Sequence, residues 1–235
     1  MSKRSLSKTS SEPDRALSAV DFVVARITDD IRNATYTGGD RLVEAEIMKS
    51  LSVSRSSVRE AIRQLTADGL VQIERNKGAR IRTLTREETL ALDQVREMLE
   101  GLAARLAAGR INLSEYQKRM KSLMKDMKAS ESSGDWRAYR KQNSAFHDLI
   151  LEMSGNETLQ RFARQLQLHS FRVQFDLPLS RFAAARSLAD HEKIVRAILD
   201  GDGGASERAM RAHIARTNQW IMNAPSAVFE PDSPT

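Results

Sequence analysis

The sequence predicts a mainly α-helical protein, with an N-terminal winged helix-turn-helix joined to a C-terminal all-α antiparallel helical bundle. Apolar residues recur at intervals of three and four through most of the 235 residues, which is the period of an amphipathic helix. Two short alternating runs around a basic turn predict a β-hairpin near residue 76, and no strand pattern appears after residue 86. A chain of this length can form two modest domains, each with its own core.

Two helices are predicted in the first fifty residues. The first contains the apolar residues of Leu17–Ile31 at helical spacing, and the turn residues at 38–40 end it. The second is short, from Val43 to Leu51, and a tight break at 52–53 follows it. Residues 1–14 are polar, and we expect them to form a flexible arm.

The third helix and the hairpin complete the N-terminal domain, which we assign to residues 15–84. Ser54 is a typical N-cap residue, an i, i+3, i+4, i+7 apolar series begins at Val58, and Gly69 ends the helix. The alternating runs on either side of residues 75–78 predict the two strands of a wing. The domain is therefore expected to contain three helices and a β-hairpin.

Residues 86–222 are predicted to form the bundle, and the domain boundary falls near residues 83–85. Residues 223–235 contain prolines and few apolar side chains, so a flexible tail is expected there. The six predicted helices are a long one that begins at Arg86, one that begins at Ser114, and residues 135–154, 157–178, 186–201 and 205–222.

Positive charge is concentrated in one short segment. The chain has a formal net charge of +6. Residues 54–82 hold seven basic and three acidic residues, so this segment alone contributes +4. An anionic partner is therefore expected at this segment rather than over the whole surface.

The sequence lacks cysteine and long apolar segments, and each absence excludes a class of protein. There is no cysteine, which excludes disulfides and thiolate metal ligands. No apolar run approaches the roughly 18 residues that suggest a membrane span, and the polar start lacks the apolar segment of a secretion signal. We expect a cytoplasmic, nucleoid-associated protein with no membrane partner.

The third predicted helix has a face suited to the major groove of double-stranded DNA. Its core stripe leaves Arg55, Arg59 and Arg63 on one opposite ridge, one helical turn apart. Arginine can donate two hydrogen bonds to guanine, and the wing tip at 75–77 would reach the minor groove or the backbone. A solvated basic face is the alternative, but the order of short helix, turn, helix and hairpin favours DNA binding.

The four histidines all lie on apolar stripes of predicted helices. Asn143 and His147 are one turn apart on one helix, whereas His191 and His213 belong to two others. Three unpaired imidazoles are costly in an apolar core, so we interpret these four residues as ligands of a divalent metal. Hydrogen-bonded core histidines are the alternative. We interpret His169 as a pocket-lining or core residue.

Three motifs carry a family resemblance in the N-terminal half: GDRLVE at 39–44, LSVSRSSVREAIRQL at 51–65 and DGLV at 68–71. They resemble the winged-helix signature of the GntR family of bacterial regulators, over about residues 17–83. The resemblance implies that Arg55 and Arg59 read bases. Ala45 departs from the pattern, since some members have a DNA-contacting arginine there. The expected DNA-binding residues are Arg41, Ser54, Arg55, Ser56, Ser57, Arg59, Arg63, Arg75, Asn76, Lys77 and Gly78.

A second resemblance covers the helical half. Several segments of this half are similar to the FCD ligand-binding domain of FadR-type GntR regulators. They lie around Val95–Ala104, Asn143–His147, 154–156, His191–Asp202 and Met210–Ile214. In that family an Asp or Asn and three histidines bind a divalent metal that helps to hold a carboxylate effector. The resemblance implies zinc first, with nickel or manganese as alternatives. The family often has aspartate at the Asn143 position, so this neutral residue implies a weaker site.

The same resemblance suggests residues for the effector. Arg96 would point into the cavity and pair with a carboxylate, because the guanidinium fork suits that group. The alternative is a surface salt bridge, for example with Glu100, one turn later. Arg172 and His169 are weaker candidates for effector contacts.

These features predict a ligand-responsive transcriptional regulator, a repressor by family resemblance, and not an enzyme. We expect a homodimer on a palindromic operator, because one recognition helix reads only a few base pairs, and a small organic acid as effector. The first alternative is a metal-dependent hydrolase with a basic accessory domain, but the sequence places no carboxylate convincingly beside the histidines and has no H-E-x-x-H motif. The second is a structural nucleoid binder.

Overall fold

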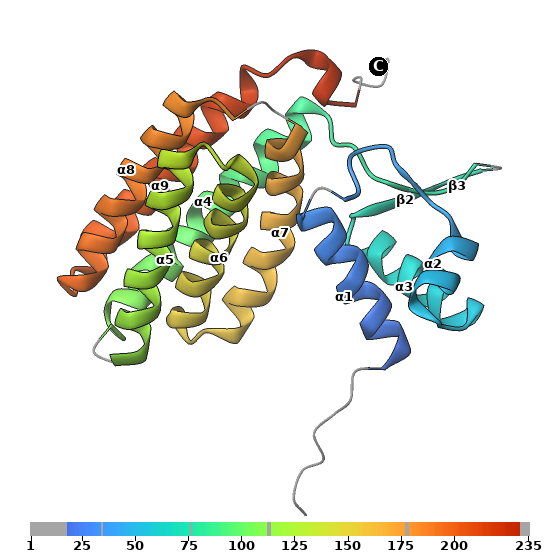
Figure 1. Cartoon of the computed structure of the whole chain (residues 1–235), viewed down its shortest axis with the longest axis horizontal. Coiled ribbons are helices and arrows are strands. Elements are labelled where there is room, and N and C mark those ends of the chain that lie inside the picture. Colours follow the sequence, from blue (N-terminus) through green and yellow to red (C-terminus); the bar gives the residue numbers. More distant parts are fainter. Residues whose placement is uncertain (1–17, 34, 76, 112–113, 177–178, 231–235) are drawn as a thin grey trace, which may run out of the picture.

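The computed structural model describes residues 18–230 except 34, 76, 112–113 and 177–178, and it leaves out the side chains of 171–176. The described chain forms two domains that lie side by side (Figure 1). The predicted flexible arm at 1–14 lies outside the described residues. No helix of the described part has the length and apolar character to cross a membrane.

The N-terminal domain is a winged helix-turn-helix, as predicted. Its sheet is antiparallel in the order β1-β3-β2, and Arg80 of the middle strand pairs with Arg41 on one side and Gln72 on the other. The strand β1 was not predicted, because two residues are too few for an alternating pattern. The elements are α1 (Ala19–Arg32), β1 (Arg41–Leu42), α2 (Glu44–Leu51), α3 (Arg55–Ala67), β2 (Val71–Glu74) and β3 (Gly78–Ile81).

The turn between α2 and α3 sets the two helices against each other. Ser52 has a left-handed backbone with a φ of 55°, which reverses the chain in a few residues. The apolar stripe of α3 then packs against that of α1, through Val58, Ile62 and Leu65 on one helix and Ile27 on the other. This packing leaves the opposite, basic face of α3 toward solvent.

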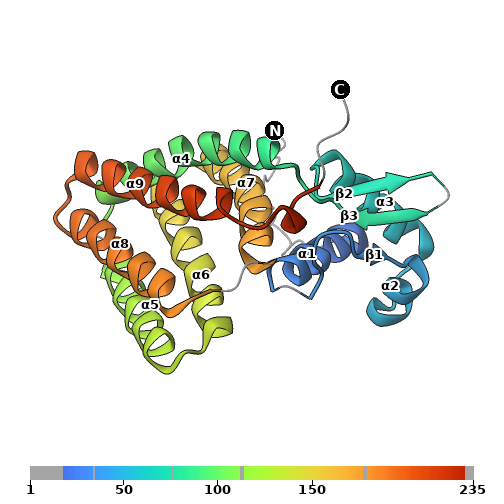
Figure 2. The same ribbon diagram turned by 90° about the horizontal axis from the view of Figure 1, so that it is seen from above.

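The C-terminal domain is an all-helical bundle in which α4 contacts most of the other helices. The long helix α4 packs against α6, α7, α8 and α9, and it lies along one outer edge of the bundle in Figure 2. Thr85 begins it with a capping box, in which Thr85 and Glu88 cap each other's backbone amides. The helices are α4 (Arg86–Ala108), α5 (Ser114–Ser133), α6 (Trp136–Ser154), α7 (Glu157–Asp176), α8 (Arg181–Leu199) and α9 (Gly203–Met222).

Two parts of the bundle differ from expectation. Helix α8 begins at Arg181, five residues earlier than predicted, because Ser180 Oγ accepts a hydrogen bond from the Ala183 amide at 3.1 Å and caps it. The described part of the expected flexible tail, residues 223–230, is docked on the protein. Phe229 is buried beneath the guanidinium of Arg86, 4.4 Å from its ring centroid.

Candidate functional site

The exposed N-terminal end of α3 is the first candidate site. Ser54 Oγ accepts a hydrogen bond from the Ser57 amide at 3.1 Å, and it lies 2.8 Å from Ser56 Oγ. These hydroxyls gather at the helix end whose dipole favours an anion. Arg55 is exposed beside them. The end of the helix thus combines hydroxyl groups and a guanidinium that can contact a phosphate backbone.

Two arginines of the same face are paired with carboxylates. Arg59 Nε donates to both oxygens of Glu44, at 3.1 and 3.2 Å, and Arg63 Nη1 donates to Glu60 at 2.8 Å. Both arginine side chains are more than half exposed, and ion pairs this exposed contribute little to stability. Each guanidinium can therefore exchange its carboxylate for a DNA acceptor at small cost.

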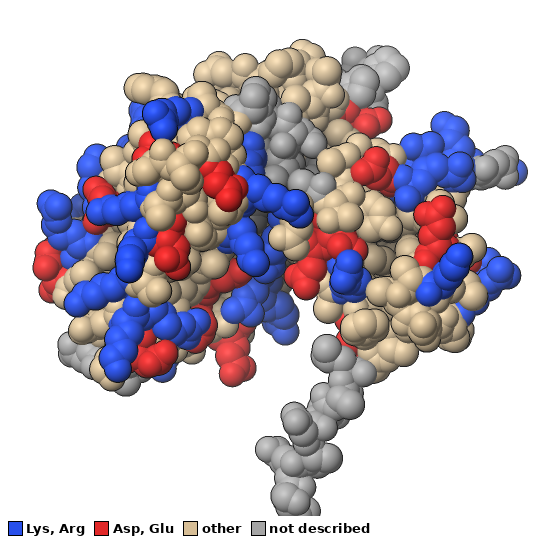
Figure 3. Space-filling model, in the orientation of Figure 1, with Lys and Arg blue, Asp and Glu red and all other residues tan. Residues whose placement is uncertain are grey.

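The wing supplies the second basic region. Arg41 Nη2 donates to the backbone oxygen of Lys77 at 2.9 Å, which ties β1 to the hairpin tip. Gly78 has a φ of +87°, a conformation that this tight turn requires. Basic side chains gather at the hairpin in Figure 3, and Arg75 is among the exposed ones. Asn76 lies outside the described residues.

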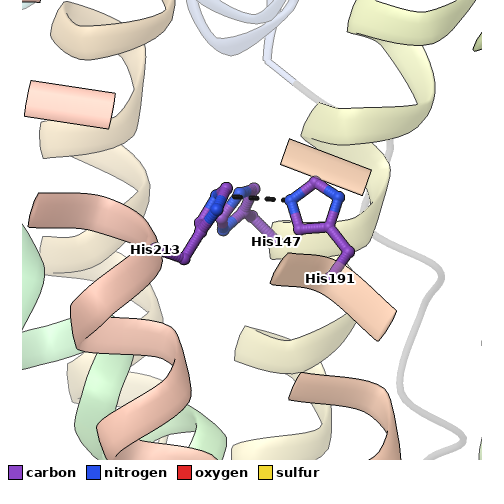
Figure 4. Close-up of side chains that lie close together, drawn as sticks. All are labelled: His147, His191 and His213. Carbon is purple, nitrogen blue, oxygen red and sulfur yellow. Dashed lines mark hydrogen bonds between the residues drawn. The ribbon is translucent and has the colours of Figure 1, made fainter. Parts of the chain in front are cut away.

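Three histidines meet in the core of the bundle. His147 of α6, His191 of α8 and His213 of α9 are buried, and one nitrogen of each lies within 4.8 Å of the others (Figure 4). The ring centroids are 4.5 to 5.7 Å apart. The structure therefore brings together imidazoles that are 44 and 22 residues apart in the sequence.

The chemistry of this cluster fits a divalent metal. Burial lowers the pKa of His191 well below its usual value and that of His213 to about 4, so both rings are neutral at pH 7, which is the ligating form. Their Nε2 atoms are 3.2 Å apart, close to the roughly 3.3 Å between two nitrogen ligands of tetrahedral zinc. His191 Nδ1 is buried without a hydrogen-bond partner. Zinc, nickel and manganese all accept imidazole, and the donor set does not select one of them.

Carboxylates orient two of the three rings. His147 Nδ1 contacts Glu100 Oε2, and His213 Nδ1 lies 3.7 Å from Asp190 Oδ2. A carboxylate on Nδ1 leaves Nε2 as the nitrogen for a metal and fixes the ring. Burial opposes the charge of Asp190, but hydrogen bonds from His213 and Arg216 outweigh it and lower the pKa of this carboxyl to about 2. The sequence-based view that no carboxylate stands beside the histidines is therefore wrong.

Both carboxylates are also bound by arginines. Arg96 Nε donates to Glu100 at 2.6 Å, and Arg216 donates to Asp190 at 2.7 Å through Nε. A carboxylate held in this way is a poor general base, because its lone pairs and its charge are already satisfied. The arrangement suits the positioning of ligands more than hydrolysis.

A pocket opens beside the cluster. Its volume is about 160 Å³, and His213, Asn143 and Asp190 lie in its wall. Asn143 is thus placed next to one of the predicted metal ligands. Sequence reasoning missed the arginines of the same wall, although Arg140 precedes Asn143 by three residues and Arg216 follows His213 by three. That spacing puts each on the same helix face as its neighbour. The pocket arginines are Arg140, Arg186 and Arg216.

Two of the predicted effector residues, Arg96 and His169, are not among the residues that line this pocket. Arg96 is almost completely buried and donates to Glu100, to Asp93 at 3.4 Å and to Ser170 at 2.6 Å. The partner Glu100 is the one named in the alternative for Arg96, but the ion pair is buried and not at the surface as that alternative had it. His169 is buried on α7 beside Gly69 of the N-terminal domain, where a Cβ on that glycine would stand 3.8 Å from the ring. The side chain of Arg172 lies outside the described residues.

Comparison with protein families gives two matches that cover most of the chain. Residues 19–81 match the model described as bacterial regulatory proteins, gntR family, and residues 91–216 match the FCD domain. The second match alone spans more than half of the chain.

Curated relatives and solved structures agree with these matches. A probable D-xylose utilization operon transcriptional repressor from Paenarthrobacter nicotinovorans is 29% identical over 83% of each chain. The regulator LutR of Bacillus subtilis is also 29% identical, over 81% of this chain and 95% of its own. A structure from Rhodococcus sp. RHA1, described as a transcriptional regulator GntR, has 23% identity and a TM-score of 0.75, and it covers 89% of this chain and 100% of that one. At this identity the structural match shows the fold alone.

Proposed function

The chain belongs to the gntR family of bacterial transcriptional regulators and carries an FCD domain, and on this premise we propose that it binds an operator as a homodimer and responds to a small organic acid at a metal site. The relatives named above are transcriptional regulators and not enzymes. The observation that carries the proposal is the convergence of three buried imidazoles beside a pocket, in a chain that also exposes a basic helix.

The arrangement of α3 supports operator binding through the predicted residues. Arg55, Arg59 and Arg63 are exposed, and the serines at 54, 56 and 57 lie at the same helix end. We assign base contacts to Arg55 and Arg59, and backbone contacts to the serines and Arg63. Arg41 and the wing tip at 75–78 would reach the flanking backbone or minor groove. The roles follow the family resemblance and the exposure of these side chains.

The histidine cluster supports a divalent metal, with zinc as the first candidate. His147, His191 and His213 would supply three nitrogens, and Asn143 would supply an oxygen from the pocket wall. A bound divalent metal would offer an open coordination position to an oxygen ligand. The nearby arginines of the pocket wall would pair with a carboxylate, because guanidinium donors match its two oxygens. We therefore expect small organic acids as effectors. We assign the pairing with the effector carboxylate to Arg140 and Arg186 in place of Arg96.

An exposed apolar stripe on α4 supports the homodimer. Val95 and Met98 are each more than half exposed, and together with Ala91 and Leu102 they recur at the four-three-four spacing that suits pairing of two helices. A second copy is the occupant that fits, because a palindromic operator needs two readers related by a two-fold axis. The stripe can pair with itself across that axis. We expect repression as the mode of action, as in the relative from Paenarthrobacter.

A thermal-shift screen of organic acids tests the effector and metal together. We expect at least one hydroxy, keto, sugar or dicarboxylic acid to raise the melting temperature when zinc is present, because a ligand that binds only the folded state stabilises it. The effect should be absent in the metal-free protein and in His213→Ala. An acid that stabilises wild type and His213→Ala equally would contradict a role for the metal.

A further inference from the structure

Helix α7 contacts both the recognition helix and the centre of the bundle. Gln165 Nε2 donates to the backbone oxygen of Asp68 at 3.1 Å, and Asp68 is the C-cap of α3. Leu168 of the same helix is buried within the apolar core of the DNA-binding domain. His169 lies against Gly69, the next residue after that cap. One side of α7 therefore holds the C-terminal end of the helix that carries the DNA-reading arginines.

The other side of α7 reaches the histidine cluster through buried charges. Ser170 Oγ accepts a hydrogen bond from Arg96 at 2.6 Å, and Arg96 donates to Glu100 at 2.6 Å. Glu100 in turn contacts His147 Nδ1. These four side chains are at most 3% exposed. A continuous polar chain thus joins a candidate metal ligand to α7.

This chain of contacts is stiff for a physical reason. Charge-assisted hydrogen bonds are short and strong in a buried site, and separation of one partner would leave an uncompensated charge. A displacement of His147 must therefore carry Glu100, Arg96 and Ser170 with it, or break a buried charged contact. Gln167, also on α7, is buried with both side-chain polar atoms unpartnered. These unmet hydrogen bonds cost free energy in the present packing of α7.

We propose that α7 couples metal occupancy at the histidine cluster to the position of the recognition helix, with Glu100, Arg96 and Ser170 as the buried link and Gln165 and Leu168 as the output contacts. The inference rests on the proposed metal site and adds the route by which its occupancy is transmitted. Gln165 and Ser170 are positioning residues, because neither lies among the expected ligands of metal or DNA. A coupling of this kind requires that the metal favours one of two arrangements of α7.

Hydrogen exchange on the full-length protein tests the link, with zinc alone as the probe. Amide exchange in residues 62–71 is measured with and without one equivalent of zinc, and calorimetry measures the zinc affinity. In wild type we expect zinc to change exchange in this segment by about threefold or more. In Ser170→Ala and in Gln165→Ala we expect the zinc affinity to stay within about threefold of wild type, while the change in residues 62–71 is lost.

Ser206→Ala is the matched control. Ser206 is another buried serine of the bundle, and its hydroxyl donates to the backbone oxygen of Asp202, the N-cap of α9, at 2.7 Å. This variant should retain the full effect of zinc on residues 62–71. The proposal is overturned if wild type binds zinc without a change in that segment, or if both Ser170→Ala and Gln165→Ala show the wild-type change. Gln165→Ala decides the matter if Ser170→Ala fails to fold. A wild-type chain that binds no zinc would refute the metal site itself, which is a different result.

Discussion

Arg59 illustrates how the residues proposed to read DNA are held. Its guanidinium donates to Glu44 of α2, on the face that α3 turns to solvent. Binding to DNA would replace this carboxylate by a base edge or a phosphate, and the exposed ion pair offers little resistance. Glu44 therefore holds the arginine on the exposed face of α3.

Replacement of Arg59 should weaken operator binding selectively. We expect Arg59→Ala to reduce the affinity for a duplex selected by the wild-type protein by roughly 5- to 150-fold, which corresponds to the about 1–3 kcal/mol of a bidentate base contact. Fluorescence anisotropy with that duplex measures the change. The control is Arg119→Ala, since Arg119 is a similarly exposed arginine paired with Glu152 in the bundle. Equal losses in the two variants would refute a specific role for Arg59.

Asp190 should raise the zinc affinity of the histidine cluster without being a ligand itself. Because it faces His213 Nδ1 and holds Arg216, Asp190→Asn should lower zinc affinity by roughly 10- to 100-fold, which is typical for the loss of a partner of a ligating histidine. Isothermal titration with zinc measures this. Glu152→Gln, which removes an exposed carboxylate that pairs with Arg119 and contacts none of the three histidines, should leave zinc affinity unchanged. An Asp190→Asn protein with wild-type zinc affinity would contradict the orienting role.

At the scale of elements, the start of α4 is where the two domains join. The capping box of Thr85 and Glu88 fixes this start, and Glu88 also contacts Arg82 at the end of the wing. Thr85→Ala removes one cap, so it should lower the free energy of unfolding by about 1 kcal/mol in urea titrations. Thr83→Ala, two residues earlier, removes no cap and should have a much smaller effect. If Thr85→Ala lowers the free energy of unfolding by less than Thr83→Ala does, the cap does not contribute to stability.

Most helices could be predicted from sequence because their apolar stripes, and in several cases a capping side chain, belong to the segment itself. Ser54, Thr85 and the glycine after α3 mark boundaries that depend on nearby residues alone. The docked segment before Phe229 could not be predicted, because its burial depends on Arg86, which is distant in the sequence. Local pattern carries no information about that contact.

The candidate site could be predicted only in part, because contacts between residues distant in the sequence leave no local pattern. The histidines stood out because polar rings on apolar stripes are unusual. Their carboxylate partners Glu100 and Asp190 could not be recognised in the sequence, because their role depends on which helices face each other. Arg96 was assigned to the effector from family resemblance, whereas the structure surrounds it with Asp93, Glu100 and Ser170.

At the level of the whole molecule, the proposed homodimer needs an interface between two copies of the chain. The apolar stripe of α4 is exposed in the single chain, and a charge within it should prevent self-association. We expect Met98→Glu to convert a dimer into a monomer in sedimentation-velocity runs and to weaken operator binding at least tenfold. Phe162→Glu introduces the same charge at another exposed apolar residue, on α7, and should leave the dimer intact. A dimeric Met98→Glu protein would exclude this stripe as the interface.

The most direct test of the account is zinc stoichiometry measured by native mass spectrometry on wild type, Arg59→Ala and His213→Ala. We expect one zinc ion per chain in wild type and in Arg59→Ala, and none in His213→Ala, which should still bind the selected duplex. A wild-type chain without bound zinc, nickel or manganese after incubation with each, or a His213→Ala protein that retains the ion, would contradict this expectation.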